Sequence, residues 1–581
     1  MDPIKVDFSG GGSKKGKSVV IPPNKAGLKL AISLIGTVIA AAIAYYFYLP
    51  AFNFQAIEMY IYFGMVILAY CVISFVTSGA LASPEYSPYA RKRVKIPIII
   101  GVVIAVIVGI GFAASSVFFR AKDYHAILAV NTDANFGAEV VEVDFANVPL
   151  LDKESAETLA TKELSELFDD NLVSQFDVNS CETQINLNQK PVRIGTLKYE
   201  NIIKWFNNCK TGLPGYLVID MNTQDVEYKK VEGGIRYSDA EHFNRLLKRH
   251  LRFKYPTKLL GDSVLEVDES GKAWWICPVY KNTIGLFGGR DVVGAIRVDP
   301  TTGDCTEYTI DQIRNDEDLK WIDRVYDPEL LVEQYDYYGK YVEGFWNSIL
   351  GQDNVVVTTD GYNYIALNDD VYMYTGVTSI TAGDSSITGF TLINQRTKEA
   401  KFYRVSGATE NAAQEAAQGK VKNFSYKASF PLLINVGGQP TYFMALKDDS
   451  NIVQQYALVN VNQFTTIVET DTTIEGCREK YIKLLKENKI DVDSDAGLNQ
   501  TDTENNKPVV QTVENKIVDI RTAVIDGNSC YYITLDGADT CFAIYASKFE
   551  EVVLANKGDV VEITYKESED AIIKAESFTR K

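Results

Sequence analysis

Residues 96–119 read IPIIIGVVIAVIVGIGFAASSVFF, a stretch without a charged side chain. A helix needs about 20 mainly apolar residues to cross the roughly 30 Å of hydrocarbon in a bilayer, and this stretch is long enough. Two earlier stretches, residues 28–49 and 57–76, pass the same test. Three such stretches in succession are not expected in a soluble protein. The sequence therefore predicts a transmembrane region at 28–119 that contains three helices.

The distribution of lysine and arginine around these stretches predicts their orientation. The tail before the first stretch and the loop between the second and third stretches are rich in both residues, whereas the loop 50–56 has neither. Lysine and arginine are enriched on the cytoplasmic side of membrane proteins. We therefore expect a multi-pass protein of the cell membrane with a cytoplasmic N-terminus. Everything after Phe119 should be extracytoplasmic.

No charged residue lies deep inside the three stretches. Transporters and proton relays usually carry such a residue within the membrane. The three helices are therefore expected to act as an anchor in membrane lipid.

Charge and histidine content exclude several classes of function. The 581-residue chain has a formal net charge of −18, whereas a nucleic-acid partner requires Lys and Arg to replace phosphate counterions. Only three histidines occur, and the patterns C-x-x-C, G-x-S-x-G and H-E-x-x-H are all missing from the sequence. We therefore expect no nucleic-acid partner, no cofactor, no metal site and no catalytic residue.

One phosphate-binding pattern is present but lacks its structural context. Residues 11–18 read GGSKKGKS, which matches G-x-x-x-x-G-K-[ST]. That loop works only between a buried strand and a helix, because the backbone amides must converge on the phosphates. Here Pro22 and Pro23 follow and would break a helix. A flexible basic tail is the better interpretation.

Alternating apolar and polar residues beyond the anchor predict an α+β architecture of antiparallel β-rich modules with a few helices. The expected segments are a cytoplasmic basic tail at 1–27, the transmembrane region at 28–119, an α+β membrane-proximal segment at 120–210, an α+β domain at 211–330, a connecting helix at 331–350, a second β-rich domain at 351–475, a helix and acidic linker at 476–513, and a C-terminal domain at 514–581.

The domain at 211–330 has an order of elements that resembles a known protein module. A helical stretch at 239–256 (DAEHFNRLLKRHLRFKYP) precedes two predicted strands, and the second strand ends in the turn Val298–Gly303, which reads VDPTTG. This order, with a V-D-x-x-T-G-like turn, resembles the PepSY module of bacterial envelope proteins over about 80 residues. The resemblance implies one helix lying on an antiparallel sheet.

The C-terminal domain at 514–581 has five short predicted strands, with a helical turn between the third and fourth. This order resembles the OB fold, a small five-stranded barrel. OB barrels that bind nucleic acid have basic grooves with stacking aromatic residues, but this domain has more acids than bases. A protein or peptide contact, or simple packing, is expected instead.

Residues 148–468 as a whole resemble a group of uncharacterised three-span membrane proteins from Gram-positive bacteria. The resemblance implies a topology and carries no known activity.

Three pairs of cysteines are candidates for disulfides, and Cys181 with Cys209 is the third option. Cys530 and Cys541 lie on the two arms of a predicted hairpin, where a bridge is geometrically possible. Cys277 and Cys305 could face each other on the PepSY-like sheet. Buried free thiols are the alternative.

A basic stretch stands out in this acidic protein and includes Arg245, Lys248, Arg249 and Arg252. It could dock on anionic lipid or on the acidic linker. The alternative is a solvated helix face whose charges pair with neighbouring acids.

The acidic linker resembles a calcium loop, with carboxylates at Asp491, Asp493 and Asp495. A calcium loop requires Gly at its sixth position and a bidentate Glu at its twelfth, where this chain has Ala496 and Asp502. A solvated linker is the better interpretation.

These features favour a non-enzymatic, membrane-anchored protein of the cell envelope that acts as a scaffold or regulator by binding envelope proteins, peptides or a wall polymer. One alternative is an extracytoplasmic hydrolase that uses carboxylates. Another is an accessory subunit of an envelope transport or secretion complex. The sequence predicts no oligomeric state.

Overall fold

The computed structural model describes residues 20, 22–134, 136–140, 151–167, 174–367, 370–380, 386–490, 492, 510–525, 528–537, 540–546, 549–566 and 572–581. The chain forms two compact units, Met1–Gly497 and Leu498–Lys581. The phosphate-loop-like pattern at 11–18 and the calcium-loop-like carboxylates lie outside the described residues.

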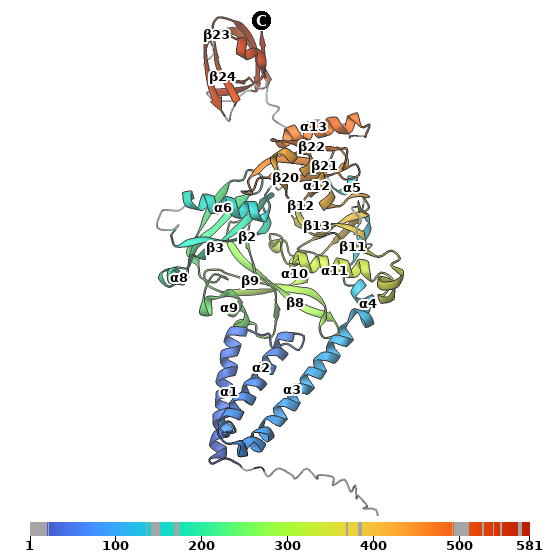
Figure 1. The fold of residues 1–581 in the computed structure, drawn as a ribbon. Helices are drawn as coiled ribbons and strands as arrows, with labels where there is room; N and C mark the ends of the chain where they lie inside the picture. The colour runs from blue at the N-terminus through green and yellow to red at the C-terminus, as the bar shows by residue number, and fades with distance from the viewer. Residues whose placement is uncertain are drawn as a thin grey trace, which may run out of the picture. The chain divides into compact units, whose positions relative to one another are not determined.

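Three long helices begin the first unit: α1 (Ala26–Tyr48), α2 (Ile57–Ser78) and α3 (Ser87–Ser115) (Figure 1). A 3-10 turn, η1 (Pro84–Tyr86), precedes α3. All three helices are long and apolar enough to cross a membrane, which confirms the predicted apolar helices. Their large side chains face outward, as for Val38 with 68% of its surface exposed. Such an apolar surface suits contact with lipid.

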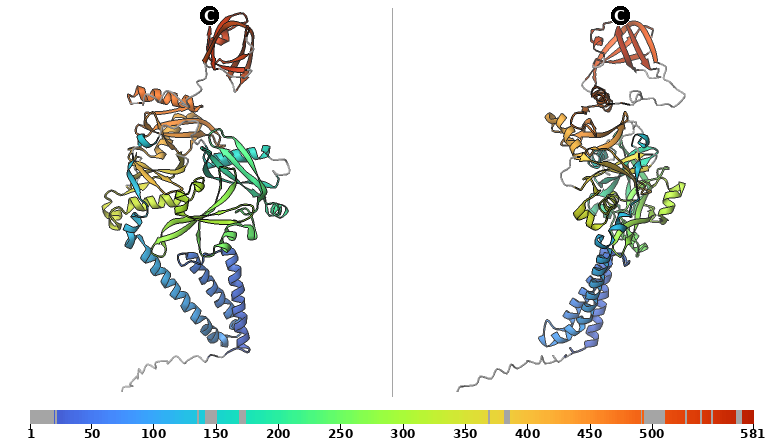
Figure 2. Two further views of the ribbon diagram at one scale, coloured as in Figure 1. Left: turned by 180° about the vertical axis from the view of Figure 1, so that it is seen from behind. Right: turned by 90° about the vertical axis from the view of Figure 1, so that its right-hand side faces the viewer.

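Four mainly antiparallel sheets follow α4 (Val117–His125), and the views in Figures 1 and 2 place the three helices to one side of them. The first sheet contains β2 (Phe176–Leu187), β3 (Lys190–Tyr199), β4 (Leu213–Asp220) and β5 (Val226–Ile235). The second contains β6 (Leu259–Leu260), β7 (Val264–Val267), β8 (Ala273–Ile284), β9 (Gly288–Val298) and β10 (Cys305–Thr309).

The third sheet contains β1 (Val130–Ala134), β11 (Val356–Thr358), β12 (Asn363–Leu367), β13 (Asp370–Ser379), β15 (Gly389–Asn394) and β16 (Ala400–Tyr403). The fourth contains β18 (Lys427–Ala428), β19 (Leu432–Val436), β20 (Gln439–Lys447), β21 (Val453–Asn460) and β22 (Val468–Asp471). A short pair, β14 (Ser386–Ile387) and β17 (Gly407–Ala408), stands apart from them.

Helices pack around these sheets. They are α5 (Phe136–Glu139), α6 (Lys153–Leu167), α8 (Ile202–Asn208), α9 (Leu247–Lys254), α10 (Ile310–Asn315), α11 (Pro328–Lys340), α12 (Glu410–Lys420) and α13 (Ile474–Glu487). The described part of the first unit also contains the 3-10 turns η3 (Phe243–Arg245), η4 (Glu317–Leu319) and η6 (Lys422–Phe424), and the π-helix η5 (Asn347–Gly351).

Two of the expected domain boundaries differ from the sheet order. The hairpin β4–β5 was expected in the domain at 211–330, but it continues the first sheet, β2-β3-β4-β5. Strand β1 was expected in the membrane-proximal segment, but it pairs in parallel with β16 of the third sheet. Strand alternation shows which face of a strand is buried but does not identify its partner. The pairings were therefore not predictable from pattern alone.

One type of hairpin turn recurs after β4, β9 and β15, beginning at Asp220, Asp299 and Asn394. In each turn the side-chain oxygen of the first residue accepts hydrogen bonds from the N–H groups two and three residues later, at 2.8–3.0 Å. The N–H of the same residue donates to the carbonyl five residues later. Thr follows at the fourth position and a residue with positive φ at the fifth. The first three sheets therefore each contain a hairpin turn of the same geometry.

The first two sheets and α9 share a hydrophobic core. Ile194 and Tyr216 of the first sheet pack in one cluster with Trp275 and Cys277 of the second and with Leu251 of α9. This core fixes the two sheets and α9 relative to one another.

The second unit is a closed barrel with the strand order β23-β24-β25-β27-β26. Its strands are β23 (Val510–Ile525), β24 (Asn528–Leu535), β25 (Cys541–Tyr545), β26 (Val560–Lys566) and β27 (Ile572–Arg580). The helical turn η7 (Glu550–Leu554) lies between β25 and β26. The five strands and the turn appear in the predicted order.

Candidate functional site

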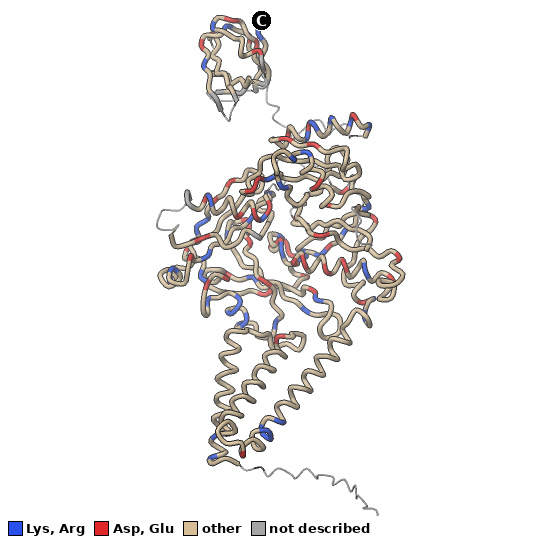
Figure 3. Tube along the Cα trace, in the orientation of Figure 1, with Lys and Arg blue, Asp and Glu red and all other residues tan. Residues whose placement is uncertain are grey.

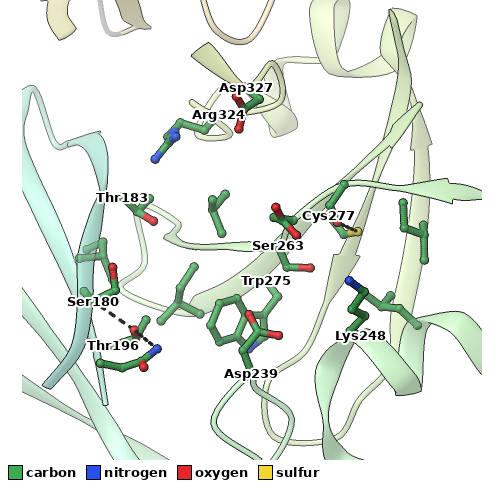
Figure 4. Close-up of a pocket in the computed structure, with 18 of the residues that line it drawn as sticks. Ser180, Thr183, Thr196, Asp239, Lys248, Ser263, Trp275, Cys277, Arg324 and Asp327 are labelled. Carbon is green, nitrogen blue, oxygen red and sulfur yellow. Dashed lines mark hydrogen bonds between the residues drawn. The ribbon is translucent and has the colours of Figure 1, made fainter. Parts of the chain in front are cut away.

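A cavity of about 420 Å³ lies between the first two sheets and α9. Ser180 and Thr183 of β2 form one wall, and Trp275 of β8 forms part of another (Figure 4). Lys248 reaches the cavity from α9, and Asp239 from the loop that follows β5. The volume falls within the range of small-molecule and peptide side-chain sites.

Three charged groups at the cavity wall are open to solvent: Asp239, Lys248 and Asp262. Among the described residues, no hydrogen bond or ion pair joins any of them to another side chain. The protein around the cavity displaces much of the solvent near Asp239, and this desolvation raises the pKa of its carboxyl group. The negative charge of Asp262 raises this pKa further, whereas the positive charge of Lys248 lowers it. The groups are therefore placed to bind a ligand of mixed charge.

A second cavity of about 470 Å³ shares Asp262 and Asp327 with the first. It adds Arg290 of β9 and Glu333 of α11. Two adjoining cavities with common lining residues can accept an elongated ligand.

A buried carboxylate supports the wall that carries Arg324. Glu266 of β7 is fully buried and accepts hydrogen bonds from the N–H groups of Asp323 at 2.8 Å and Arg324 at 3.1 Å. Burial raises the pKa of Glu266 to about 7, although both hydrogen bonds and the Arg324 charge lower it. Glu266 thus holds the chain segment that places Arg324 and Asp327 at the cavity.

Cys277 lines the cavity but is not poised as a nucleophile. Its Sγ donates a hydrogen bond to the carbonyl oxygen of Gly261 at 3.4 Å. Burial raises the pKa of the Cys277 thiol to about 12, so almost no thiolate exists near neutral pH. Cys277 therefore acts as a small apolar wall residue.

The four basic residues predicted to form a docking patch separate into different environments. Arg249 and Arg252 are each 7% exposed, and both face the end of α1. Arg249 Nε donates to the carbonyl oxygen of Tyr46 at 3.0 Å, and Arg252 Nε donates to that of Leu49 at 3.1 Å. These carbonyls lie at the C-terminus of α1, where the helix itself leaves them without partners.

The other two basic residues lie elsewhere. Arg245 donates to the carbonyl oxygen of Cys209, and Lys248 lines the cavity. A solvated helix face, the alternative considered from sequence, is wrong for Arg249 and Arg252, because contact with the anchor buries them.

The structure does not bring the predicted cysteine pairs together. Strand β9 separates Cys277 of β8 from Cys305 of β10, so two strand spacings, about 10 Å, lie between them. Cys541 lies opposite Thr534. Thr534 is four residues beyond Cys530 along β24, so the two cysteines are offset by about 13 Å along the strand. Both separations exceed disulfide reach. Among the described residues, which include all eight cysteines, no disulfide is formed.

Within the described ranges, no cluster of three or more His, Cys, Asp or Glu side chains is placed to hold a metal. Comparison with models of known protein families matches none of them, and comparison with curated proteins gives no significant match. The site must therefore be interpreted from its own chemistry.

Sequence inspection missed Asp239, Asp262 and Ser263 as site residues. They lie in loops outside any motif, and the tertiary fold brings them together with strands from two sheets. The only signal in the sequence was their proximity to the basic stretch that contains Lys248.

Proposed function

We propose that this protein is a membrane-anchored, non-enzymatic binding protein of the cell envelope. The observation that carries the proposal is the cavity between the first two sheets, where the charged groups of Asp239, Lys248 and Asp262 are open to solvent and unpaired with one another. The extracytoplasmic ligand is a peptide segment, from another envelope protein or from the peptide part of a wall polymer.

A peptide fits this cavity because it offers ammonium or guanidinium groups, carboxylates and carbonyls at intervals along one chain. Lys248 suits a carboxylate of the ligand, and Asp239 with Asp262 suits a cationic group. Trp275 and Leu260 supply apolar surface for the intervening side chain.

The extracytoplasmic placement is supported by the charge distribution of the anchor. Figure 3 shows lysines and arginines at the end of the three helices remote from the sheets. Near the start of α3 the chain carries Arg91, Lys92, Arg93 and Lys95. Arg93 donates there to Ser33 Oγ at 3.0 Å. The positive-inside rule assigns that end to the cytoplasm.

An exposed apolar patch on α8 and η3 also supports a partner-binding role. Ile203, Phe206 and Phe243 are 67%, 61% and 56% exposed, and the rings of Phe206 and Phe243 both pack against Trp205. Contiguous apolar surface of this kind commonly marks a protein contact.

We further propose that the sheet-plus-helix modules are PepSY-like and that the C-terminal barrel is OB-like. The PepSY-like assignment is supported by the turn at Val298–Gly303, whose geometry recurs at Asp220 and Asn394. The OB-like assignment is supported by the five-stranded closed barrel with a helical turn after its third strand. Both agree with the proposed kinship to three-span envelope proteins of Gram-positive bacteria.

Topology is tested with a single cysteine at the exposed Ser450, in a variant whose native cysteines are replaced. A membrane-impermeant maleimide should label Ser450→Cys in intact cells. Labelling only after lysis, repeated at a second exposed position, would place the sheets in the cytoplasm and overturn the envelope function.

Ligand binding is tested with a photo-crosslinking amino acid at Ser263, which lines the cavity, and at Ser450 as the remote control. In intact cells the Ser263 probe should capture a peptide or an envelope protein, and Asp239→Asn or Lys248→Met should reduce the yield several-fold. An unchanged yield in both charge variants, or no adduct above the Ser450 control, would contradict the proposal.

A hydrolase that uses carboxylates is the second candidate. Asp239 and Asp262 line one cavity, and the pKa of Asp239 is raised by burial and by Asp262, as a general acid requires. In that case Asp239→Asn would abolish turnover of a captured peptide and leave its capture intact. If Asp239→Asn instead loses capture of the peptide, and the wild-type protein does not turn the peptide over, the result favours the binding function.

A further inference from the structure

A second surface of the β-rich part carries a row of exposed apolar side chains in the segment that follows α11. Val342, Trp346, Ile349 and Leu350 are 39%, 63%, 52% and 76% exposed. Val342 lies in a turn before Gly344, whose φ of 86° interrupts the helical winding, and Trp346, Ile349 and Leu350 follow it. The segment includes the π-helix η5. We refer to these four residues as the apolar row.

The apolar row adjoins the last residues of the third apolar stretch. The ring of Phe118 lies 5.0 Å from that of Phe345 and 5.9 Å from that of Trp346. Phe118 and Phe119 are themselves 48% and 68% exposed and end the uncharged stretch that starts at Ile96. Through Trp346, the apolar row thus adjoins the apolar surface at the end of the third stretch.

The position of Phe118 relative to the bilayer follows from helix length. Residues 96–115 of α3 extend about 30 Å, which matches the hydrocarbon thickness of a bilayer. Helical geometry is interrupted at Ser116, and Phe118 follows in the first turn of α4, so it emerges where the acyl chains meet the headgroups. Immediately beyond it, Arg120 and Asp123 form an ion pair that is half exposed, as expected on the aqueous side. Tryptophan is enriched at this boundary.

We infer that the apolar row inserts into the lipid leaflet beside the sheets, at the headgroup–acyl boundary. This contact holds the β-rich part to the bilayer at a second place, remote in sequence from the α1 end that Arg249 and Arg252 contact. The occupant of the surface is lipid, because the row continues the surface of a membrane-spanning helix.

The composition of the segment specifies the kind of lipid contact. Residues 341–352 read YVEGFWNSILGQ, in which Glu343 is the only charged residue. The segment itself contains no lysine or arginine to attract anionic headgroups. Insertion therefore depends on apolar burial alone and should be independent of anionic lipid and of salt.

Two isoleucines with the same exposure provide a matched comparison. Ile349 in the apolar row and Ile452 in the turn between β20 and β21 are both 52% exposed. The full chain is prepared with its partly exposed cysteines, Cys71, Cys209, Cys305 and Cys541, replaced by alanine. A nitroxide is attached at Ile349→Cys or Ile452→Cys, and the protein is placed in phosphatidylcholine nanodiscs. Collision rates with oxygen, which concentrates in lipid, and with a water-soluble nickel chelate report immersion.

The oxygen-to-nickel collision ratio should be at least several-fold higher at Ile349 than at Ile452, and it should not change when anionic lipid is added. Leu350→Cys should give the same result, which guards against a local effect of one label. A ratio at both row positions equal to that at Ile452 would show a water-facing surface and overturn the inference. Protection of both row positions from oxygen and nickel alike would show a protein contact and would overturn it as well.

Discussion

Arg252 Nε donates a hydrogen bond to the carbonyl oxygen of Leu49 at 3.1 Å, across 203 residues of sequence. Leu49 is the C-cap of α1. The same guanidinium donates to the carbonyl oxygen of Lys258 at 2.6 Å. One buried arginine therefore ties the end of a membrane helix to the start of the second sheet.

Replacement of this arginine should loosen the junction. Arg252→Met leaves buried carbonyl groups without donors, which costs about 1–3 kcal/mol. The melting temperature of the detergent-solubilised full chain should fall by about 1 °C for each kcal/mol lost, because a unit of this size has a large entropy of unfolding. Arg404→Met, which removes an exposed arginine, is the matched control and should change little. Equal effects of the two substitutions would contradict the junction role.

The recurring hairpin turn makes a prediction about side-chain chemistry. Asp299→Asn should preserve stability, because the chain itself places Asn394 in the same turn with the same two hydrogen bonds. Asp299→Ala should lose about 1–2 kcal/mol, because the N–H groups of Thr301 and Thr302 lose their acceptor. Denaturant unfolding of both variants measures the difference. A loss as large for Asn as for Ala would show that the Lys272 ion pair is more important than the turn.

Stability should depend on pH through Glu266. Its pKa is raised by burial from 4.5 to about 7, so between these values the folded chain keeps a proton that the unfolded chain has released. Stability supplied by the neutral carboxyl is therefore complete below pH 4.5 and decreases as the pH rises towards 7. Thermal unfolding between pH 5 and 7.5 should show a wild-type decrease of roughly 1–3 kcal/mol that Glu266→Gln lacks.

Glu479→Gln, at an exposed glutamate, is the control for that experiment and should retain the wild-type pH profile. A Glu266→Gln profile parallel to the wild type would show that another group is responsible.

The cysteines should divide by burial. Cys181 and Cys277 have thiol pKa values that burial raises to about 12, so near neutral pH a maleimide should react with them about three orders of magnitude more slowly than with an ordinary thiol. The partly exposed Cys209 and Cys541 should react first. Unfolding without a reductant should release all eight thiols, as counted by mass spectrometry. A deficit of two would indicate a disulfide.

Local patterns predicted local structure well. The apolar stretches became α1, α2 and α3. Residues 410–420, which read ENAAQEAAQGK, form α12, and its N-cap Thr409 accepts from the N–H of Ala412. A helix cap and the length of an apolar stretch are both properties of one short segment, so the sequence of that segment is enough to predict them. The helix expected at 239–256 was shorter, because α9 begins only at Leu247.

Strand partnership was less predictable, and the cysteine pairs show why. Cys277 and Cys305 lie on strands of one sheet, as expected, but β9 runs between them. Alternation marks the buried face of a strand and leaves open which strand lies beside it. For the same reason the sequence did not predict that β4 and β5 continue the sheet of β2 and β3.

By itself, the sequence determined the three apolar helices, the β-rich character of the remainder and the order of elements in the C-terminal barrel. Each depends on composition or on neighbours within a few residues. Only the tertiary structure decided the strand partners, the burial of Arg252 at the end of α1, and the cavity where Asp239, Lys248 and Asp262 meet. These depend on contacts between residues far apart in the chain, which the packing of the shared core determines and no local pattern records.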